Sequence, residues 1–241
     1  QGAKLVNKAL SNGAIFETDV WKQAITRCVG DRAGTLHLLG LHSDGGVHST
    51  NQHMYLLLQR AADEGVTSCA VHILHDGRDV PARSALAYIQ DTEAVLAEIN
   101  ATGAGRNFRI ASGGGRMTIT MDRYEADWGM VEHGYMCHVH GEGPVFHSAT
   151  EAVETMYAET DKGDQYLGRF VVGDNAGRAV GKIVDGDAVV LFNYRGDRSI
   201  EISRAFEEND FAVFDRTSAN AELHPDVFFT GILQYDGDAL I

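Results

Sequence analysis

Short apolar runs of strand length alternate with longer amphipathic stretches along most of this 241-residue chain. The stretches between the runs carry apolar residues at helical spacing. Strands and helices in this order predict an α/β fold, with three layers (α/β/α) around a mainly parallel sheet. The expected strands cover residues 35–41, 68–74, 107–112, 187–194 and 227–233, and the expected helices cover residues 50–65, 82–99, 124–136, 148–159 and 200–208.

One region departs from this alternation. Residues 160–186 are rich in glycine and less regular, so we expect an excursion with a short hairpin there rather than a domain boundary. The chain has no internal repeat and no low-complexity run, and it is long enough to bury a sizeable core.

Charge and cysteine content limit the classes of function. The formal net charge of −14 at pH 7 argues against a nucleic-acid-binding surface, because it would repel a phosphate backbone. No segment is long and apolar enough to span a membrane, and the N-terminus lacks the basic-then-apolar order of a secretory signal. Cys28, Cys69 and Cys137 are far apart and odd in number, which indicates buried free thiols. We therefore expect a cytoplasmic protein that binds neither nucleic acid nor membrane.

Polar side chains follow the carboxyl ends of four expected strands. In open α/β sheets the strand-to-helix loops gather along one edge, and ligands bind there. The loops read SDGGVH after the first strand and DGRD after the second, GGGR and then MDR after the third, and NYRGDR at the end of the fourth. The residues expected to meet in one crevice are His48, Arg78, Asp79, Arg116, Arg123, Arg195 and Arg198.

Five arginines in one crevice indicate an anionic ligand. The guanidinium group is a planar fork of donors suited to phosphate and carboxylate, and several together can override an acidic surface. Asp79 cannot bind an anion, so it suits orienting a substrate hydroxyl or receiving its proton. His48 can donate to a phosphoryl oxygen. The expected ligand is a phosphorylated hydroxy acid.

Each motif also has a structural interpretation. SDGGVH alone is more often a turn with a helix N-cap, and DGRD suits an Arg–Asp pair that stabilises a loop. GGGR lacks nucleotide-binding spacing, and R-x-x-R before a helix is usually surface charge. His37 and His72 lie in apolar runs and are expected in the core or at its rim. No histidine shows tight ligand spacing with a carboxylate, so no metal site is expected. The recurrence of the motifs at strand ends favours a binding site.

The same motifs, in this order, resemble one family, the cofactor-independent (2,3-bisphosphoglycerate-independent) phosphoglycerate mutases. The similar segments are LHLLGLHSDGGVHS, DGRDVP, SGGGR followed by MDR, DGDAVVLFNYRGDR and the closing QYDGD. The resemblance runs over essentially the whole chain. The segment GGGRMTITMDRYEADW resembles the branch found in plants and trypanosomatids.

The resemblance implies a two-domain enzyme of which this chain is one part. In the family, a phosphatase-like domain carries a nucleophilic serine and two manganese ions, and a phosphotransferase domain inserted into it orients the glycerate. Nothing here matches the family's G-N-S-E-V-G-H segment or its metal ligands. We therefore expect residues 1–18 to connect from the absent domain, 19–232 to form the phosphotransferase domain and 233–241 to begin the return connection. The family's members are usually monomers.

The resemblance also implies roles for the residues after the first two strands. In the family, the serine takes the phosphoryl group from one glycerate hydroxyl and returns it to the other, which interconverts 3- and 2-phosphoglycerate. Carried over by motif, His48 contacts the phosphoryl group, and Arg78 and Asp79 hold the glycerate. Asp79 is the candidate for handling hydroxyl protons. The expected catalytic residues are therefore Asp79 and His48.

The remaining arginines receive roles in the same way. Arg116 and Arg123 are expected to bind the carboxylate and hydroxyl end of the substrate, and Arg195 and Arg198 to neutralise phosphate charge. The chain departs from the family in two places. The spacing from Arg116 to Arg123 is one residue longer than in the commonest bacterial pattern, and His42 stands where leucine is usual.

Three hypotheses follow from the sequence. The first is the substrate-orienting half of a phosphoglycerate mutase, inactive as a mutase by itself. The second is a stand-alone phosphometabolite-binding module without catalysis. The third, a self-sufficient metal-dependent phosphohydrolase, is disfavoured because the sequence shows no dinuclear ligand set.

Overall fold

The structure is a computed structural model that describes residues 2–31, 33–218 and 224–237. A seven-stranded sheet has the strand order β4-β5-β3-β2-β1-β6-β7. All neighbouring strands are parallel except β3 and β5, which confirms the mainly parallel sheet. The strands are β1 (Leu36–His42), β2 (Ser68–His75), β3 (Asn107–Gly115), β4 (Val145–Phe146), β5 (Phe170–Val172), β6 (Ala188–Leu191) and β7 (Phe228–Gly231).

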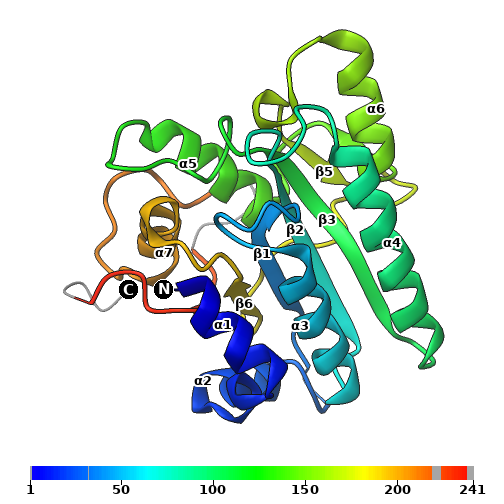
Figure 1. The fold of residues 1–241 in the computed structure, drawn as a ribbon, viewed down its shortest axis with the longest axis vertical. Helices are drawn as coiled ribbons and strands as arrows, with labels where there is room; N and C mark the ends of the chain where they lie inside the picture. Colours follow the sequence, from blue (N-terminus) through cyan, green and yellow to red (C-terminus); the bar gives the residue numbers. More distant parts are fainter. Residues whose placement is uncertain (1, 32, 219–223, 238–241) are drawn as a thin grey trace.

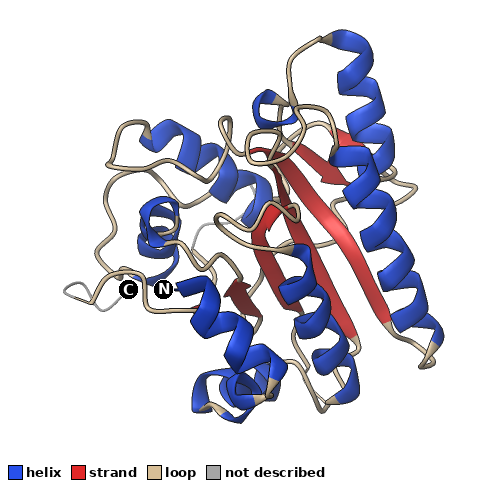
Figure 2. Cartoon of the chain, in the orientation of Figure 1, coloured by secondary structure: helices blue, strands red, loops and turns tan. Residues whose placement is uncertain are grey.

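Helices cover both faces of the sheet (Figures 1 and 2). On one face the core joins α1, α2, α3, α4 and α6 to the strands, and on the other it joins α5 and α7, so the three-layer α/β/α architecture is confirmed. No helix of the described residues has the length and apolar character needed to cross a membrane. The helices are α1 (Gly2–Ser11), α2 (Asp19–Arg27), α3 (Asn51–Asp63), α4 (Ala85–Ala101), α5 (Trp128–Tyr135), α6 (Ala149–Glu159) and α7 (Ile200–Glu207), with short helical turns at Ala14–Glu17, Met136–His140, Asp164–Tyr166 and Gly196–Arg198.

The sequence pattern of β1 and α3 explains why they form and pack. Every residue of β1 is buried, because strands covered on both faces carry nearly continuous apolar runs. The helix α3 then turns one apolar stripe toward the sheet. It ends before Gly65, whose φ of 95° belongs to the left-handed region that favours glycine. The buried apolar residues of the stripe are Met54, Leu57, Leu58, Ala61 and Ala62.

The expected excursion over residues 160–186 extends the sheet. Its strand β5 pairs antiparallel with β3, at Ser112 and Gly113. An antiparallel bridge between Gly173 and Ala179 closes the short hairpin that the sequence predicted.

The alternation predicted neither the N-terminal helices nor the short strand β4. Within the expected connection 1–18, α1 and the turn after it are helical, and Val6, Leu10 and Phe16 join the core of the first face. The domain boundaries themselves stay a prediction. Residues 238–241 of the expected return connection lie outside the described residues.

Candidate functional site

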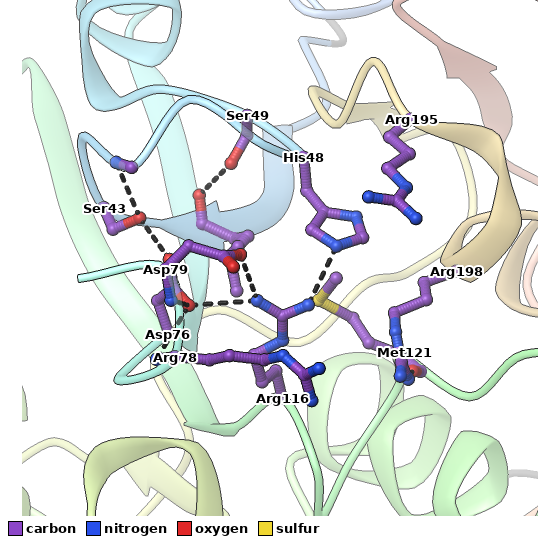
Figure 3. Close-up of polar contacts among 12 residues, drawn as sticks. Ser43, His48, Ser49, Asp76, Arg78, Asp79, Arg116, Met121, Arg195 and Arg198 are labelled. Atoms are coloured by element: carbon purple, nitrogen blue, oxygen red, sulfur yellow. Dashed lines mark hydrogen bonds and ion pairs between the residues drawn. The ribbon is translucent and has the colours of Figure 1, made fainter. Parts of the chain in front are cut away.

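The loops after four strands meet at the carboxyl edge of the sheet, as the topology predicted (Figure 3). His48 follows β1, and Arg78 and Asp79 follow β2. The other members follow β3 and β6, the strands that flank β2 and β1 in the sheet. These four further residues are Arg116, Arg123, Arg195 and Arg198.

Arg116 lies at the centre of this cluster and is only 2% exposed. Its Nη1 donates to Asp76 Oδ1 at 2.9 Å and to Asp79 Oδ2 at 2.7 Å. Its Nη2 donates to His48 Nε2 at 2.8 Å. One buried guanidinium therefore fixes the positions of both residues that the sequence predicts to be catalytic.

Asp76 belongs to the site, although it was not among the residues predicted from the sequence. Its Oδ2 accepts from the Ser43 hydroxyl at 2.7 Å, and its Oδ1 accepts from the backbone N–H of Asp79 at 3.0 Å. Burial opposes ionisation, but these hydrogen bonds and Arg116 outweigh it and lower the pKa of Asp76. The signal in the sequence was the first Asp of DGRD, a residue type that often accepts from N–H groups two or three positions ahead.

One ring nitrogen of His48 has no hydrogen-bond partner among the described residues. A guanidinium can only donate, so Nε2 accepts from Arg116, and the proton of the neutral ring lies on Nδ1. Burial, followed by the charge of Arg116, lowers the pKa of His48 to about 4, which keeps the ring neutral. Nδ1 is buried without a hydrogen bond, on the side of the ring that faces Arg195 (Figure 3). Its N–H is therefore a donor without an acceptor among the described residues.

Arg195 and Arg123 form the exposed side of the cluster. The side chain of Arg195 is 47% exposed and donates from Nε and Nη2 to the two oxygens of Asp197 at 2.8 and 3.0 Å. The Arg123 side chain is 42% exposed, and its Nη1 lies 3.8 Å from Asp197 Oδ2. Both guanidinium groups have donors left for an incoming anion.

Arg198 is buried beside them, and no carboxylate of the described residues forms an ion pair with it. Its Nη1 donates to the backbone carbonyl of Met121 at 2.5 Å. Burial, followed by the positive charges of Arg123 and Arg116, lowers the pKa of Arg198. Arg78 is exposed and forms no ion pair within the described residues.

The arrangement carries an excess of positive charge. Five arginines of the cluster are matched by three contacting carboxylates, those of Asp76, Asp79 and Asp197. A small anion would relieve the repulsion among the guanidinium groups, despite the net charge of −14 of the whole chain. Within the described residues, no three or more His, Cys, Asp or Glu side chains gather in a way that could hold a metal ion.

Other residues singled out in the sequence lie outside this cluster. His37 and His72 are buried in the core, as expected. His42 is buried, and its Nε2 bonds to Thr92 Oγ1 of α4 at 2.7 Å, so it joins β1 to a helix. The three cysteines are free and buried, as predicted.

The family described as BPG-independent PGAM (phosphoglycerate mutase) N-terminus matches residues 6–237. The chain belongs to this family. The resemblance found in its motifs is thereby confirmed. The match covers β1 to β7 and with them all seven predicted site residues.

Members of this family from distant organisms resemble the chain along nearly its whole length. A probable 2,3-bisphosphoglycerate-independent phosphoglycerate mutase of Leptospira interrogans is 53% identical over 239 residues, which are 99% of this chain and 42% of the relative. The corresponding enzyme of Trypanosoma brucei brucei is 47% identical, and a probable one of Arabidopsis thaliana is 48% identical. The chain thus spans about two fifths of the length of these curated relatives.

A solved structure shows the same fold. Leishmania mexicana phosphoglycerate mutase, crystallised at low cobalt concentration, superposes with a TM-score of 0.94 at 44% sequence identity. The match covers 99% of this chain and 42% of that one.

Proposed function

We propose that this chain is the substrate-orienting, phosphotransferase part of a 2,3-bisphosphoglycerate-independent phosphoglycerate mutase, an isomerase that interconverts 3- and 2-phosphoglycerate in glycolysis and gluconeogenesis. The observation that carries the proposal is the Arg116-centred cluster, in which a neutral His48 and Asp79 are fixed beside a surplus of arginines. Family membership supports it, because the named relatives are such enzymes.

The phosphoryl group is assigned to the His48 side of the cluster. The free Nδ1–H of His48 donates to one phosphoryl oxygen, and Arg195 and Arg198 balance the phosphate charge. Because the His48 ring is neutral and carries its proton on Nδ1, it binds the phosphoryl oxygen as an uncharged hydrogen-bond donor.

The glycerate is assigned to the Asp79 side. Asp79 Oδ2 accepts from Arg116, and its second oxygen has no hydrogen-bond partner among the described residues, so it can accept from a substrate hydroxyl and receive its proton. Arg78 and Arg123 reach the carboxylate with their exposed guanidinium groups. Direct contact of Arg116 with the carboxylate stays a prediction, since its observed contacts hold Asp76, Asp79 and His48.

The serine nucleophile, the phosphoserine intermediate and two manganese ions are assigned to the part of the relatives that this chain does not match. Among the described residues, no three or more His, Cys, Asp or Glu side chains gather in a way that could hold these ions. A domain that is inserted into another is joined to it by two connecting segments, and these segments must lie side by side. Gly2 of α1 lies against Leu233, since a Cβ on Gly2 would be 3.1 Å from Leu233 Cδ1. On this proposal the chain alone is inactive as a mutase, monomeric and cytoplasmic.

A titration of the chain with 3-phosphoglycerate, followed by NMR or calorimetry, tests the proposal. We expect saturable binding that is tighter than binding of inorganic phosphate or D-glycerate. Arg195→Ala should weaken it by about tenfold, the value of one charge-assisted hydrogen bond. Arg178→Ala, which removes an exposed arginine of the 173–179 hairpin, is the matched control and should change nothing.

Two outcomes would contradict the proposal. Absence of binding at millimolar 3-phosphoglycerate would remove the substrate site from this chain. Clear mutase turnover by the chain with manganese would refute the assignment of the serine and metal site to another domain. If the chain binds 3-phosphoglycerate but no turnover occurs, either by the chain alone or after the missing part is supplied, the second hypothesis, a phosphometabolite-binding module, would be favoured.

A further inference from the structure

Six polar side chains form an unbroken hydrogen-bonded chain on the face of the sheet that α5 covers. We call it the buried polar chain, because each member is at most 2% exposed. Its members come from three neighbouring strands, from the loop after β3, from the helical turn after α5 and from the residue before β6. In order they are Asp187, His37, His72, Ser112, His138 and Thr120.

The carboxylate of Asp187, at one end of the buried polar chain, determines which atoms donate and which accept in the first hydrogen bonds. Asp187 accepts from the backbone N–H groups of Thr35 at 2.7 Å and Val184 at 2.9 Å. His37 Nε2 lies 3.0 Å from Asp187 Oδ2 and donates to it. Burial lowers the pKa of His37, so the ring is neutral and its Nδ1 accepts. The donor to Nδ1 is His72 Nε2, at 2.9 Å.

Donors and acceptors alternate in the same way along the remaining hydrogen bonds, as far as Thr120. Burial lowers the pKa of His72 well below its usual value and that of His138 to about 3, so both rings are neutral. His72 Nδ1 accepts from the Ser112 hydroxyl at 2.7 Å, and Ser112 Oγ accepts from His138 Nδ1 at 2.7 Å. His138 Nε2 then accepts from the Thr120 hydroxyl at 2.9 Å. One carboxylate thus sets three histidine tautomers and two hydroxyl orientations.

The chain ends in a loop with an unusual backbone. The non-glycine residues of the described chain with positive φ are Thr120 at 68°, Tyr124 at 61° and Glu125 at 55°. All three lie in the loop 120–125, which carries Arg123. A β-branched residue such as threonine rarely adopts this conformation, so the surrounding structure must hold it.

Contacts around Thr120 connect the loop to the candidate site. A Cβ at Gly134 of α5 would lie 2.0 Å from Thr120 Oγ1, so the helix approaches closely only because this residue is glycine. The carbonyl of the next residue, Met121, is the acceptor that holds Arg198. A shift of Thr120 would therefore move both Arg198 and Arg123.

We propose that the buried polar chain positions Thr120 and thereby holds the Arg123 loop and the carbonyl anchor of Arg198 in the geometry that the substrate requires. Asp187 and Thr120 are 2% and 1% exposed, so neither end opens to solvent and the chain is not a path for protons to bulk water. Its members are positioning residues. The inference deepens the proposed function, and only its binding readout rests on that function.

Ring nitrogen NMR of the whole chain at pH 7 tests the hydrogen-bond order without any ligand. We expect neutral rings with the proton on Nε2 of His37 and His72 and on Nδ1 of His138. A reversed tautomer at any of these three residues, or a protonated ring, would overturn the order and with it the proposal.

Amide hydrogen exchange over residues 120–125 tests the positioning. Thr120→Val removes the terminal hydroxyl and keeps the branched shape, and Ser112→Ala breaks the chain in the middle. Both should accelerate exchange in the loop by about tenfold or more, because a buried ring nitrogen loses its partner. Thr120→Ser, which restores the hydroxyl, should exchange at the original rate. Ser203→Ala is the control, since it deletes another buried hydroxyl, one that donates to the carbonyl of Ser199 at the start of its own helix, α7.

The same variants are then titrated with 3-phosphoglycerate. We expect about tenfold weaker binding by Thr120→Val and unchanged binding by Thr120→Ser and Ser203→Ala. Unchanged loop exchange, or unchanged affinity, in Thr120→Val would overturn the proposal, even if Ser112→Ala does not fold. Absence of binding by the unsubstituted chain would instead refute the proposed function, and the exchange rates alone would then decide the positioning role.

Discussion

Arg116 differs from the other arginines of the site in the number of site residues that its buried guanidinium holds in place. Arg195 and Arg123 keep exposed guanidinium groups, whereas Arg116 contacts two carboxylates and an imidazole. At the scale of single residues, the site therefore divides into groups with donors left for a ligand and one group that holds its neighbours in place. The sequence could not make this division, because every arginine at a strand end has the same chemistry until its neighbours are known.

Replacing Arg116 tests this division. Arg116→Met is expected to lower the free energy of unfolding by about 3–5 kcal/mol, because it leaves the Asp76 carboxylate buried without its cation. The double variant Arg116→Met/Asp76→Asn should lose less free energy of unfolding than the two single variants lose together, because both substitutions remove the same ion pair. Urea unfolding of the single and double variants measures this. The control Arg178→Met removes a surface pair with Asp174 and should change stability little. A cost of Arg116→Met no greater than that of the control would contradict the assignment.

At the scale of elements, the glycines at the end of β3 are explained by the excursion that crosses them. Residues 164–167 pass over this strand end, where the N–H of Gly115 donates to Leu167 O at 3.0 Å. A Cβ on Gly115 would lie 2.4 Å from the carbonyl oxygen of Gln165, which is backbone and cannot rotate away. The run GGGR thus combines a close crossing of backbone with the placement of Arg116.

Gly115→Ala is accordingly expected to destabilise the chain by about 1–3 kcal/mol, the usual range for overpacking. Gly168→Ala is its matched control in the crossing segment, because a Cβ there would meet nothing within 4 Å. That control should stay within about 0.5 kcal/mol of the original stability. Thermal or urea unfolding of the two variants compares them, and equal stabilities would show that the crossing is not closely packed.

At the scale of the whole molecule, buried neutral histidines make stability depend on pH. Burial lowers the pKa of His42 to about 3 and that of His75 to about 4, against about 6.5 in an unfolded chain. Such a group is protonated only after unfolding, so its contribution is complete above pH 6.5 and is lost as the pH falls toward the folded value. The buried histidines whose pKa is lowered are His37, His42, His48, His53, His72, His75 and His138.

We therefore expect the free energy of unfolding to fall between pH 7 and pH 5, by up to about 1.4 kcal/mol per pH unit for each such histidine. Urea unfolding at several pH values measures the slope. Glu201 acts in the opposite direction, because burial raises its pKa to about 7 and it keeps a proton in the folded chain. Acidification also reduces the net charge of −14, which favours the folded state. Stability that is constant or rises from pH 7 to pH 5 would show that these opposing effects exceed those of the histidines.

The sequence by itself determined the α/β class, the central strands and the seven residues at the strand ends. The strands follow from the hydrophobic period, which is a local property of the chain. The residues at the strand ends follow from the general rule that parallel strands of an open α/β sheet end at one edge. The tertiary structure alone decided that β5 runs antiparallel, that Asp76 joins the site and that three histidines align into the buried polar chain. The physical reason is that hydrogen-bond partners from different strands depend on sheet register and on which helix covers each face. No spacing along the sequence encodes those contacts.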